Sequence, residues 1–439
     1  MSLEKILYVV HCVDTEGPLD ETLDATFDRL DSLFGIRLPA TKENLLKIQN
    51  LEFDFSGQEQ AIANCFTPEL LRYNSTWTEL ETMLDEILSE KFRLQLPDSD
   101  GKGWVYSWHC MDHMGFTTNP RHKDYGYGKI FRFYKSKLQK SRNSSDELNW
   151  HFHPLSVTRN PTHAATSYVN SYDVLIEIMC RRILEDSWFP VVNRPGFHSE
   201  RPDSHAFLEQ WIPFDYANQF CEEDQDQPDT SEGRFGDWRR APKSWRGYHP
   251  SHDDYQTPGY CRRTIFRCLN IGTRMRSLTN QHVTEAFKEA ETYGAAILAF
   301  ANHDWRNIKP DIERVLDLVS SAHRNFPDVR IKYSGAEEAA KSLLGFQNEP
   351  TLKFYAHLID NRLNVEVISG DIFGPQPFLA IQTKSGSFFH DNFDVMVPRK
   401  VWTYVLDEQT IRLEDISMIG VGSAGKFGNF AVSVLNLGS

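Results

Sequence analysis

Two patterns of apolar and polar residues follow one another along the chain. Over the first 345 or so residues, short apolar runs such as 5–13 and 295–301 alternate with segments like 172–184, where apolar residues recur every three to four positions. A continuous apolar run is typical of a strand buried in a parallel sheet, and the longer spacing is typical of a helix that covers it. This alternation predicts an α/β fold with the helices outside. Strands so short and numerous favour a (β/α) barrel of seven or eight strands.

The pattern changes after residue 347, where every second residue becomes apolar. Leu352, Phe354 and Ala356 are separated by polar residues, and similar runs continue towards the end of the chain. Alternation with a period of two, interrupted by turn residues, predicts antiparallel strands. We therefore expect a (β/α) barrel over residues 1–347 and an all-β sandwich over residues 348–439.

Charge and composition exclude several classes of protein. The chain has 439 residues, with 47 basic and 61 acidic side chains and a formal net charge of −14. This balance argues against a nucleic-acid partner, whose binding relies on neutralising phosphates. No apolar run is long enough to span a membrane, and the first one lacks a cleavage-site pattern. The seven cysteines include no Cys-x-x-Cys pair, so we expect neither a disulfide framework nor a zinc ribbon, and we predict a cytoplasmic protein.

Two pairs of potential ligands stand at the ends of strand-like runs. Asp14 and Glu16 follow the first apolar run, and residues two apart on a strand point the same way. They could converge on the rim that holds the active sites of barrel proteins, or they could cap a helix. His151 and His153 end another run. Two histidines and one carboxylate form a ligand set of catalytic zinc sites, so these residues are candidate metal ligands.

Further candidates also stand at the ends of strand-like runs. Arg194 could fork onto a carboxylate, or it could lie on the surface before a turn. His303 follows the most apolar run in the chain and could be a proton donor or a core histidine. A third segment contains His109, Asp112 and His113, which we expect to contact substrate or to support the rim rather than to bind metal.

The order of these motifs resembles that of the polysaccharide deacetylase (NodB-homology) superfamily. Its pattern has an acidic pair near the first strand, a histidine motif ending in His-Pro, an Arg-Pro-Gly segment, a hydrophobic residue before Asp, and a late histidine after an apolar strand. The corresponding residues here are Asp14 and Glu16, His151 and His153 before Pro154, Arg194 before Pro195-Gly196, Asp215, and His303. The resemblance spans roughly residues 5–345 and rests on motifs rather than on continuous identity.

The resemblance implies a metal-dependent hydrolase that removes an N-acetyl group from a sugar in cell-surface polysaccharide metabolism. By this resemblance, Asp14 is the catalytic base and Glu16 the metal ligand, with the reverse assignment as the alternative, and Arg194 holds Asp14 in its ionised form. His303 is implied to protonate the departing amine. The products would be acetate and a free amino sugar.

The same resemblance implies that Glu16, His151 and His153 bind one divalent ion. Zinc is the first expectation, with cobalt, nickel, iron and manganese as alternatives. The commonest family pattern places its two histidines four residues apart, whereas Asn149 stands four residues before His153. Two other functions therefore stay open. One is a non-catalytic carbohydrate-binding barrel with a degenerate site, and the other is an amidohydrolase-type metal hydrolase, since such enzymes also use His-x-His.

The irregular segment 217–260 is expected to cover the substrate. Its residues Arg239, Arg240 and Trp245 interleave cations with an aromatic ring, which suits an anionic, nucleotide-linked or lipid-linked sugar. The alternative is a solvated loop that balances its own acidic half. With the candidates above, the predicted substrate-binding set is His109, Asp112, His113, Asp215, Arg239 and Trp245.

Overall fold

Seven parallel strands close into a barrel in the computed structural model of the chain, which describes residues 4–141, 145–161, 163, 167–222, 236–273 and 276–438. The sheet has eight parallel strands, of which the first seven close the barrel. They are β1 (Ile6–Thr15), β2 (Tyr106–Cys110), β3 (Glu147–Trp150), β4 (Val192–Asn193), β5 (Phe214–Asn218), β6 (Thr264–Asn270), β7 (Ala295–His303) and β8 (Arg330–Tyr333). Each strand from β1 to β6 pairs with the next, and β7 pairs with β1. Strand β8 pairs with residues 6–9 of β1, and β2 pairs with residues 11–15. The prediction of a parallel barrel is confirmed, with seven closing strands.

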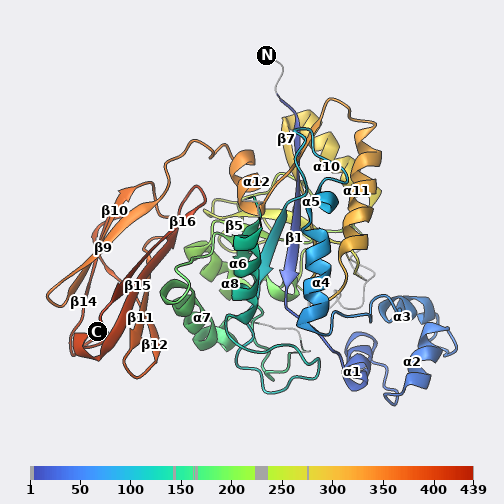
Figure 1. The fold of residues 1–439 in the computed structure, drawn as a ribbon, viewed down its shortest axis with the longest axis horizontal. Helices are drawn as coiled ribbons and strands as arrows, with labels where there is room; N and C mark the ends of the chain where they lie inside the picture. The colour runs from blue at the N-terminus through green and yellow to red at the C-terminus, as the bar shows by residue number, and fades with distance from the viewer. Residues whose placement is uncertain are drawn as a thin grey trace.

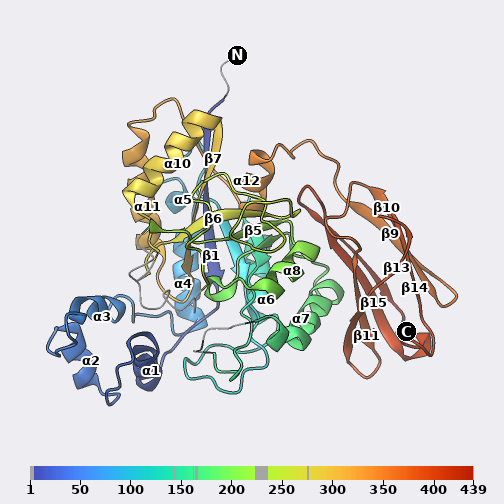
Figure 2. The same cartoon turned by 180° about the vertical axis from the view of Figure 1, so that it is seen from behind.

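Helices surround this barrel and extend beyond one end of it (Figures 1 and 2). They are α1 (Leu23–Phe34), α2 (Lys42–Gln49), α3 (Glu59–Cys65), α4 (Trp77–Ile87), α5 (Glu90–Arg93), α6 (Lys129–Lys140), α7 (Tyr172–Leu184), α8 (Pro202–Trp211), α10 (Asn280–Tyr293), α11 (Lys309–His323) and α12 (Ala336–Leu343). Figure 1 shows α1 to α3 apart from the other helices, beyond the end to which the β1 arrow points. These three helices have a small core of their own, which includes Phe27, Ile48 and Ile62.

Local sequence signals fix several helix ends. The Thr76 side chain accepts a hydrogen bond from the Glu79 amide, and the Glu79 carboxylate accepts from the Thr76 amide, which forms a capping box at the start of α4. Helix α10 ends at Gly294, whose φ of 89° suits a residue without a side chain. These ends set where the chain returns to the barrel, so they position the strands that follow.

The C-terminal residues form two antiparallel sheets. Their strands are β9 (Lys353–Ile359), β10 (Arg362–Ser369), β11 (Phe378–Thr383), β12 (Phe388–Asp391), β13 (Asp394–Val397), β14 (Val401–Val405), β15 (Ile416–Ala424) and β16 (Phe430–Asn436). One sheet has the order β13-β14-β10-β9 and the other β12-β11-β15-β16. Val365 and Trp402 of the first sheet share a core with Ile381 and Ile419 of the second. This arrangement agrees with the expected sandwich.

The second antiparallel sheet packs on helix α7 of the barrel. Gly420 and Gly422 of β15 lie so close to α7 that a Cβ at these positions would approach Ile183 to 2.5 Å and 2.9 Å. The small residues let side chains of the helix, such as Ile183, pack directly on the backbone of the strand. The expected boundary at residue 348 falls in the connection between α12 and β9, and division into two independent domains stays a prediction. Within the described part of the chain, every helix is too short or too polar to span a bilayer.

Candidate metal centre and active site

Strand register brings Asp14, His109 and His303 to the same edge of the barrel. Asp14 is the ninth residue of β1 and lies opposite His303 of β7 on one side and His109 of β2 on the other. Glu16 follows β1 directly, so it stands at the carboxyl end of the strands. This end of a parallel barrel is where active sites lie.

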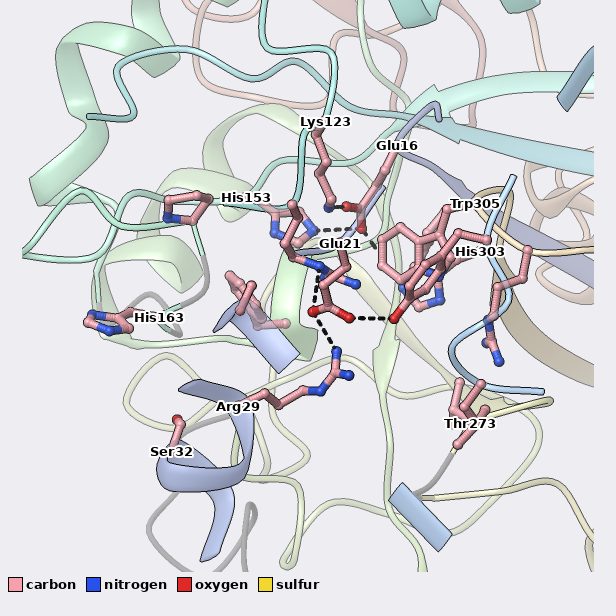
Figure 3. A pocket seen from close by; sticks show the side chains of 18 of the residues that line it. Glu16, Glu21, Arg29, Ser32, Lys123, His153, His163, Thr273, His303 and Trp305 are labelled. Atoms are coloured by element: carbon pink, nitrogen blue, oxygen red, sulfur yellow. Dashed lines mark hydrogen bonds and ion pairs between the residues drawn. The ribbon is translucent and has the colours of Figure 1, made fainter. Parts of the chain in front are cut away.

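Glu16, His151 and His153 converge on one point at this rim (Figure 3). The Nε2 atoms of the two histidines are 3.0 Å apart, and Oε1 of Glu16 lies 3.4 Å from Nε2 of His153 and 3.9 Å from Nε2 of His151. Two atoms bound to one zinc ion at about 2.0–2.1 Å and tetrahedral angles lie about 3.3–3.4 Å apart. The group therefore has close to the spacing of a metal ligand set.

The surroundings orient these side chains as metal ligands. Nδ1 of His151 donates a hydrogen bond to the carbonyl of Arg194 at 2.7 Å, which leaves the lone pair of the neutral ring on Nε2, the atom that faces Glu16 and His153. Burial lowers the pKa of His151 to about 3, so this ring is neutral. Oε1 of Glu16 has no hydrogen-bond partner among the described residues. A buried carboxylate oxygen without a donor, beside two neutral imidazoles, fits a divalent ion.

Gly196 allows His153 to take this position. A Cβ at Gly196 would lie 2.3 Å from Cδ2 of His153 and 2.8 Å from its Cα, whereas ordinary carbon contacts are about 3.5–4.0 Å. The amide of Gly196 also donates to the carbonyl of Phe152 at 2.9 Å. The Arg-Pro-Gly segment therefore packs directly on the histidine segment, and only glycine fits there.

Asp14 is held by Arg194 beside the metal group. Nε of Arg194 donates to both carboxylate oxygens of Asp14, at 2.8 and 2.9 Å, and the side chains of both residues are almost completely buried. Arg194 also donates to the carbonyl of Tyr216 at 3.2 Å, and its Nη2 lies 3.2 Å from Nδ1 of His198. The guanidinium therefore fixes the position of the Asp14 carboxylate beside Glu16 and the two histidines.

His303 faces both carboxylates from β7, the strand that pairs with β1. Its Nε2 lies 3.7 Å from Oδ2 of Asp14 and 3.9 Å from Oε1 of Glu16, and its ring stacks on Trp305 at 4.1 Å. Nδ1 of His303 has no hydrogen-bond partner among the described residues. Burial lowers the pKa of His303 well below its ordinary value, and nearby cations such as Arg306 act in the same direction.

The Asp304 carboxylate binds backbone amides and does not face the cavity. Its carboxylate accepts hydrogen bonds from the amides of Glu16 at 2.8 Å and Gly17 at 3.2 Å, and from the Tyr134 hydroxyl at 2.8 Å. These contacts fix the turn that presents Glu16. They also count against the amidohydrolase alternative, in which a late aspartate near His303 would face the substrate.

Lys123 is a member of the site that sequence reasoning missed. It comes from the loop between β2 and α6, its side chain is 8% exposed, and its ammonium forms an ion pair with Oε2 of Glu16. The ammonium also lies 4.5 Å from the ring centre of Trp305. Burial lowers the pKa of Lys123, while the carboxylate of Asp304 opposes this shift. No motif surrounds Lys123 in the sequence, so its role follows only from the fold.

A cavity of about 210 Å³ lies between the barrel rim and helix α1 (Figure 3), and its lining includes Asp14, Glu16, Lys123, His151, His153 and His303. On the outer wall, Glu21 forms ion pairs with Arg29 of α1 at 2.9 Å and with Arg121 at 3.2 Å, and accepts from the Tyr73 hydroxyl at 2.6 Å. The cavity therefore has mixed charge. Its aromatic lining consists of Tyr73, Phe116, Phe197 and Trp305.

The structure brings one member of the His109–Asp112–His113 cluster to the cavity. His113 lines it, and neither ring nitrogen of His113 has a hydrogen-bond partner among the described residues. His109 is fully buried, and Asp112 accepts from Arg182 at 2.7 Å and from a backbone amide. Neither His109 nor Asp112 lines the cavity, so their contact with substrate stays a prediction.

The other predicted substrate residues lie away from the cavity. Asp215 is buried in an ion pair with Arg263 and accepts from Asn193 at 2.9 Å. Trp245 is 1% exposed and lies under Arg267, with 4.6 Å between the guanidinium and the ring centre. Both residues are enclosed by the protein itself, and their role in substrate binding stays a prediction.

The segment 217–260 also departs from the expected lid over its described residues, 217–222 and 236–260. Arg239 forms an ion pair with Asp237 at 2.8 Å, and Arg240 pairs with Asp254 at 2.6 Å. Neither arginine lines the cavity. These two arginines are paired with acids of the same segment, whereas the acidic run after Glu222 lies outside the described residues, so the balance between the two halves stays a prediction.

A second group of potential ligands comprises Cys221, Glu222 and His282. Glu222 is exposed, and the guanidinium of Arg267 lies 3.7 Å from its carboxylate, so this group is less enclosed than the one at the barrel rim. Comparison of the chain with models of known protein families, with curated proteins and with solved structures gave no match in any of the three. The family resemblance therefore rests on the motifs quoted above.

Proposed function

We propose that the protein is a metal-dependent hydrolase that removes an N-acyl group, in the first instance acetyl, from a sugar. The observation that carries the proposal is the convergence of Glu16, His151 and His153 at the barrel rim, with Asp14 and His303 beside them. A divalent ion held by these three ligands would supply Lewis-acid polarisation of an amide carbonyl and would acidify water. The aromatic lining of the cavity offers flat apolar faces that suit sugar rings.

The protein's own residues have complementary roles in such a reaction. Asp14, held in place by Arg194, accepts a proton from the attacking water as the water oxygen adds to the amide carbon. His303 is neutral because of burial, so the proton that it gives to the departing nitrogen must first come from Asp14, whose Oδ2 lies 3.7 Å from its Nε2. The C–N bond breaks as that nitrogen is protonated. The products are a carboxylic acid and an amine, which balances the reaction.

Asn149 does not weaken this proposal. It is buried on β3 beside His109, and the two histidines reach Glu16 without it. The His-x-His spacing works because β3 ends at Trp150, so that His151 and His153 belong to the segment that leaves the strand and packs on Gly196. This local geometry differs from a pair spaced four residues apart.

The test is acetate release from monomeric, oligomeric and nucleotide-linked N-acetylhexosamines by zinc-loaded protein. We expect one class to be hydrolysed, with kcat lowered about 10²- to 10⁴-fold in Asp14→Asn and in His303→Gln. Asp20→Asn is the matched control, because Asp20 is an exposed acid of the same segment and lies outside the metal group. Circular dichroism shows whether each variant is folded. Absence of hydrolysis in every class, or hydrolysis that survives in folded Asp14→Asn, would contradict the proposal.

A further inference from the structure

Lys123 is a cation placed at the ligand group itself. Its ammonium contacts Oε2 of Glu16, while Oε1 of the same carboxylate faces the two histidines (Figure 3). The two oxygens of Glu16 are therefore divided between the lysine and the metal group. Both side chains are almost completely buried, with 8% of Lys123 and none of Glu16 exposed.

The loop holds Lys123 in this position. The backbone carbonyl of Lys123 accepts hydrogen bonds from the Asn119 side chain at 2.6 Å and from the Tyr125 amide at 3.0 Å. Its ammonium lies over the Trp305 ring, which in turn stacks on His303. The contact with Glu16 is thus supported on several sides and is not a chance position of a long surface side chain.

Two cations near one carboxylate oppose each other. An ammonium on Oε2 and a divalent ion near Oε1 would be separated by only a few ångströms in a site that excludes most water, where Coulomb repulsion is strong. Removing a buried lysine from its partner is also unfavourable, because the charge is left without compensation. The same carboxylate therefore binds the lysine best when no divalent ion is present.

We propose that Lys123 competes with the divalent ion for Glu16 and so weakens metal binding at this centre. The inference rests on the metal centre of the proposed function and deepens it. In the metal-free protein, Lys123 neutralises Glu16 and keeps the carboxylate beside the histidines. When the ion binds, the ion takes over the neutralisation of Glu16 from the lysine.

The experiment is a zinc titration of metal-free protein against a chromophoric chelator. We expect Lys123→Met to bind zinc on the order of tenfold or more tightly than the wild type, because the competing charge is gone. Lys123→Gln is a second neutral variant in case methionine does not fold, and Lys123→Arg should keep the weaker affinity. Lys129→Met is the matched control, because Lys129 pairs with Asp124 at the surface and should leave zinc affinity unchanged.

Each outcome decides the inference. Equal or weaker zinc binding in folded Lys123→Met overturns it, and weaker binding would show that the lysine positions Glu16 instead. Tighter binding that survives added His151→Ala and His153→Ala also overturns it, because the ion would then be elsewhere. If the wild type binds zinc through the histidines and the lysine variants do not differ, only this inference fails. If no form binds zinc, the proposed function fails with it.

Discussion

Replacing Gly196 by alanine tests the close packing on which the metal group depends. The added Cβ would lie 2.3 Å from Cδ2 and 2.4 Å from Cγ of His153. Since ordinary carbon contacts begin near about 3.5 Å, the ring must retreat by roughly 1.2 Å. Rotation of the ring alone does not relieve the clash, because the Cα of His153 would be only 2.8 Å away. Backbone on one side of the contact must therefore move.

The size of the effect follows from this displacement. Overpacking of a buried contact lowers the free energy of unfolding by about 1–3 kcal/mol. Metal affinity should suffer more, because ligand distances are tolerated only within about 0.2 Å. Disturbing even the groups that support a ligand lowers affinity about 10- to 100-fold, so we expect a loss of at least about 100-fold when His153 itself moves.

The assay is zinc affinity by chelator competition, together with urea unfolding of the metal-free protein. Gly126→Ala is the matched control, because a Cβ at Gly126 meets no atom within 4 Å and neither property should change. The reasoning is refuted if Gly196→Ala is folded and binds zinc as tightly as the wild type. His153 would then not be a ligand, or its segment would not pack on Gly196.

Two further predictions concern groups away from the metal. His11 is buried and neutral, since its Nδ1 accepts from Trp104 at 3.1 Å and its Nε2 faces the Asn302 oxygen at 2.9 Å, and burial lowers its pKa from 6.5 to about 3. As the pH falls, His11 takes up its proton in the unfolded chain before it does so in the fold, so the free energy of unfolding should fall between about pH 6.5 and pH 3. Measured by urea unfolding, His11→Gln should reduce the slope of this fall by about 1.4 kcal/mol per pH unit. An unchanged slope would show that His11 is protonated in the fold. Replacing Arg239 and Arg240 together by alanine should leave KM unchanged in the acetate assay, because both arginines pair within their own segment; a raised KM would restore their role in substrate binding.

The spacing of apolar residues predicted those helices and strands that bury one apolar face against the rest of the barrel. The spacing at residues 172–184 corresponds to α7, and the capping box before α4 is present. The small helices α1 to α3 were missed, because they pack mainly on one another in a separate core rather than on the barrel. Strand β4 has only two residues, although the apolar run before it is longer, since those residues fill space between elements instead of pairing.

The part of the site that lies at strand ends could be predicted from the sequence. Asp14 and His303 are adjacent because their strands pair in register. In a parallel barrel the carboxyl ends of all strands lie at one rim, so the sequence already indicated that these two residues would be near each other. Lys123 was not predictable, because its contact with Glu16 depends on the path of a loop that carries no motif. The environment of Trp245 was not predictable for a related reason. An aromatic residue in an irregular segment has the same local pattern whether it faces a ligand or, as here, a buried arginine.

The central claim is that Glu16, His151 and His153 hold one divalent ion. The most direct test is the metal content of the protein after loading with zinc and removal of the excess, measured for the wild type and for a His151→Ala, His153→Ala double variant. The account predicts one zinc per chain in the wild type and none at this centre in the double variant, with both proteins folded. A wild type that retains no zinc, or a double variant that retains as much as the wild type, would contradict it.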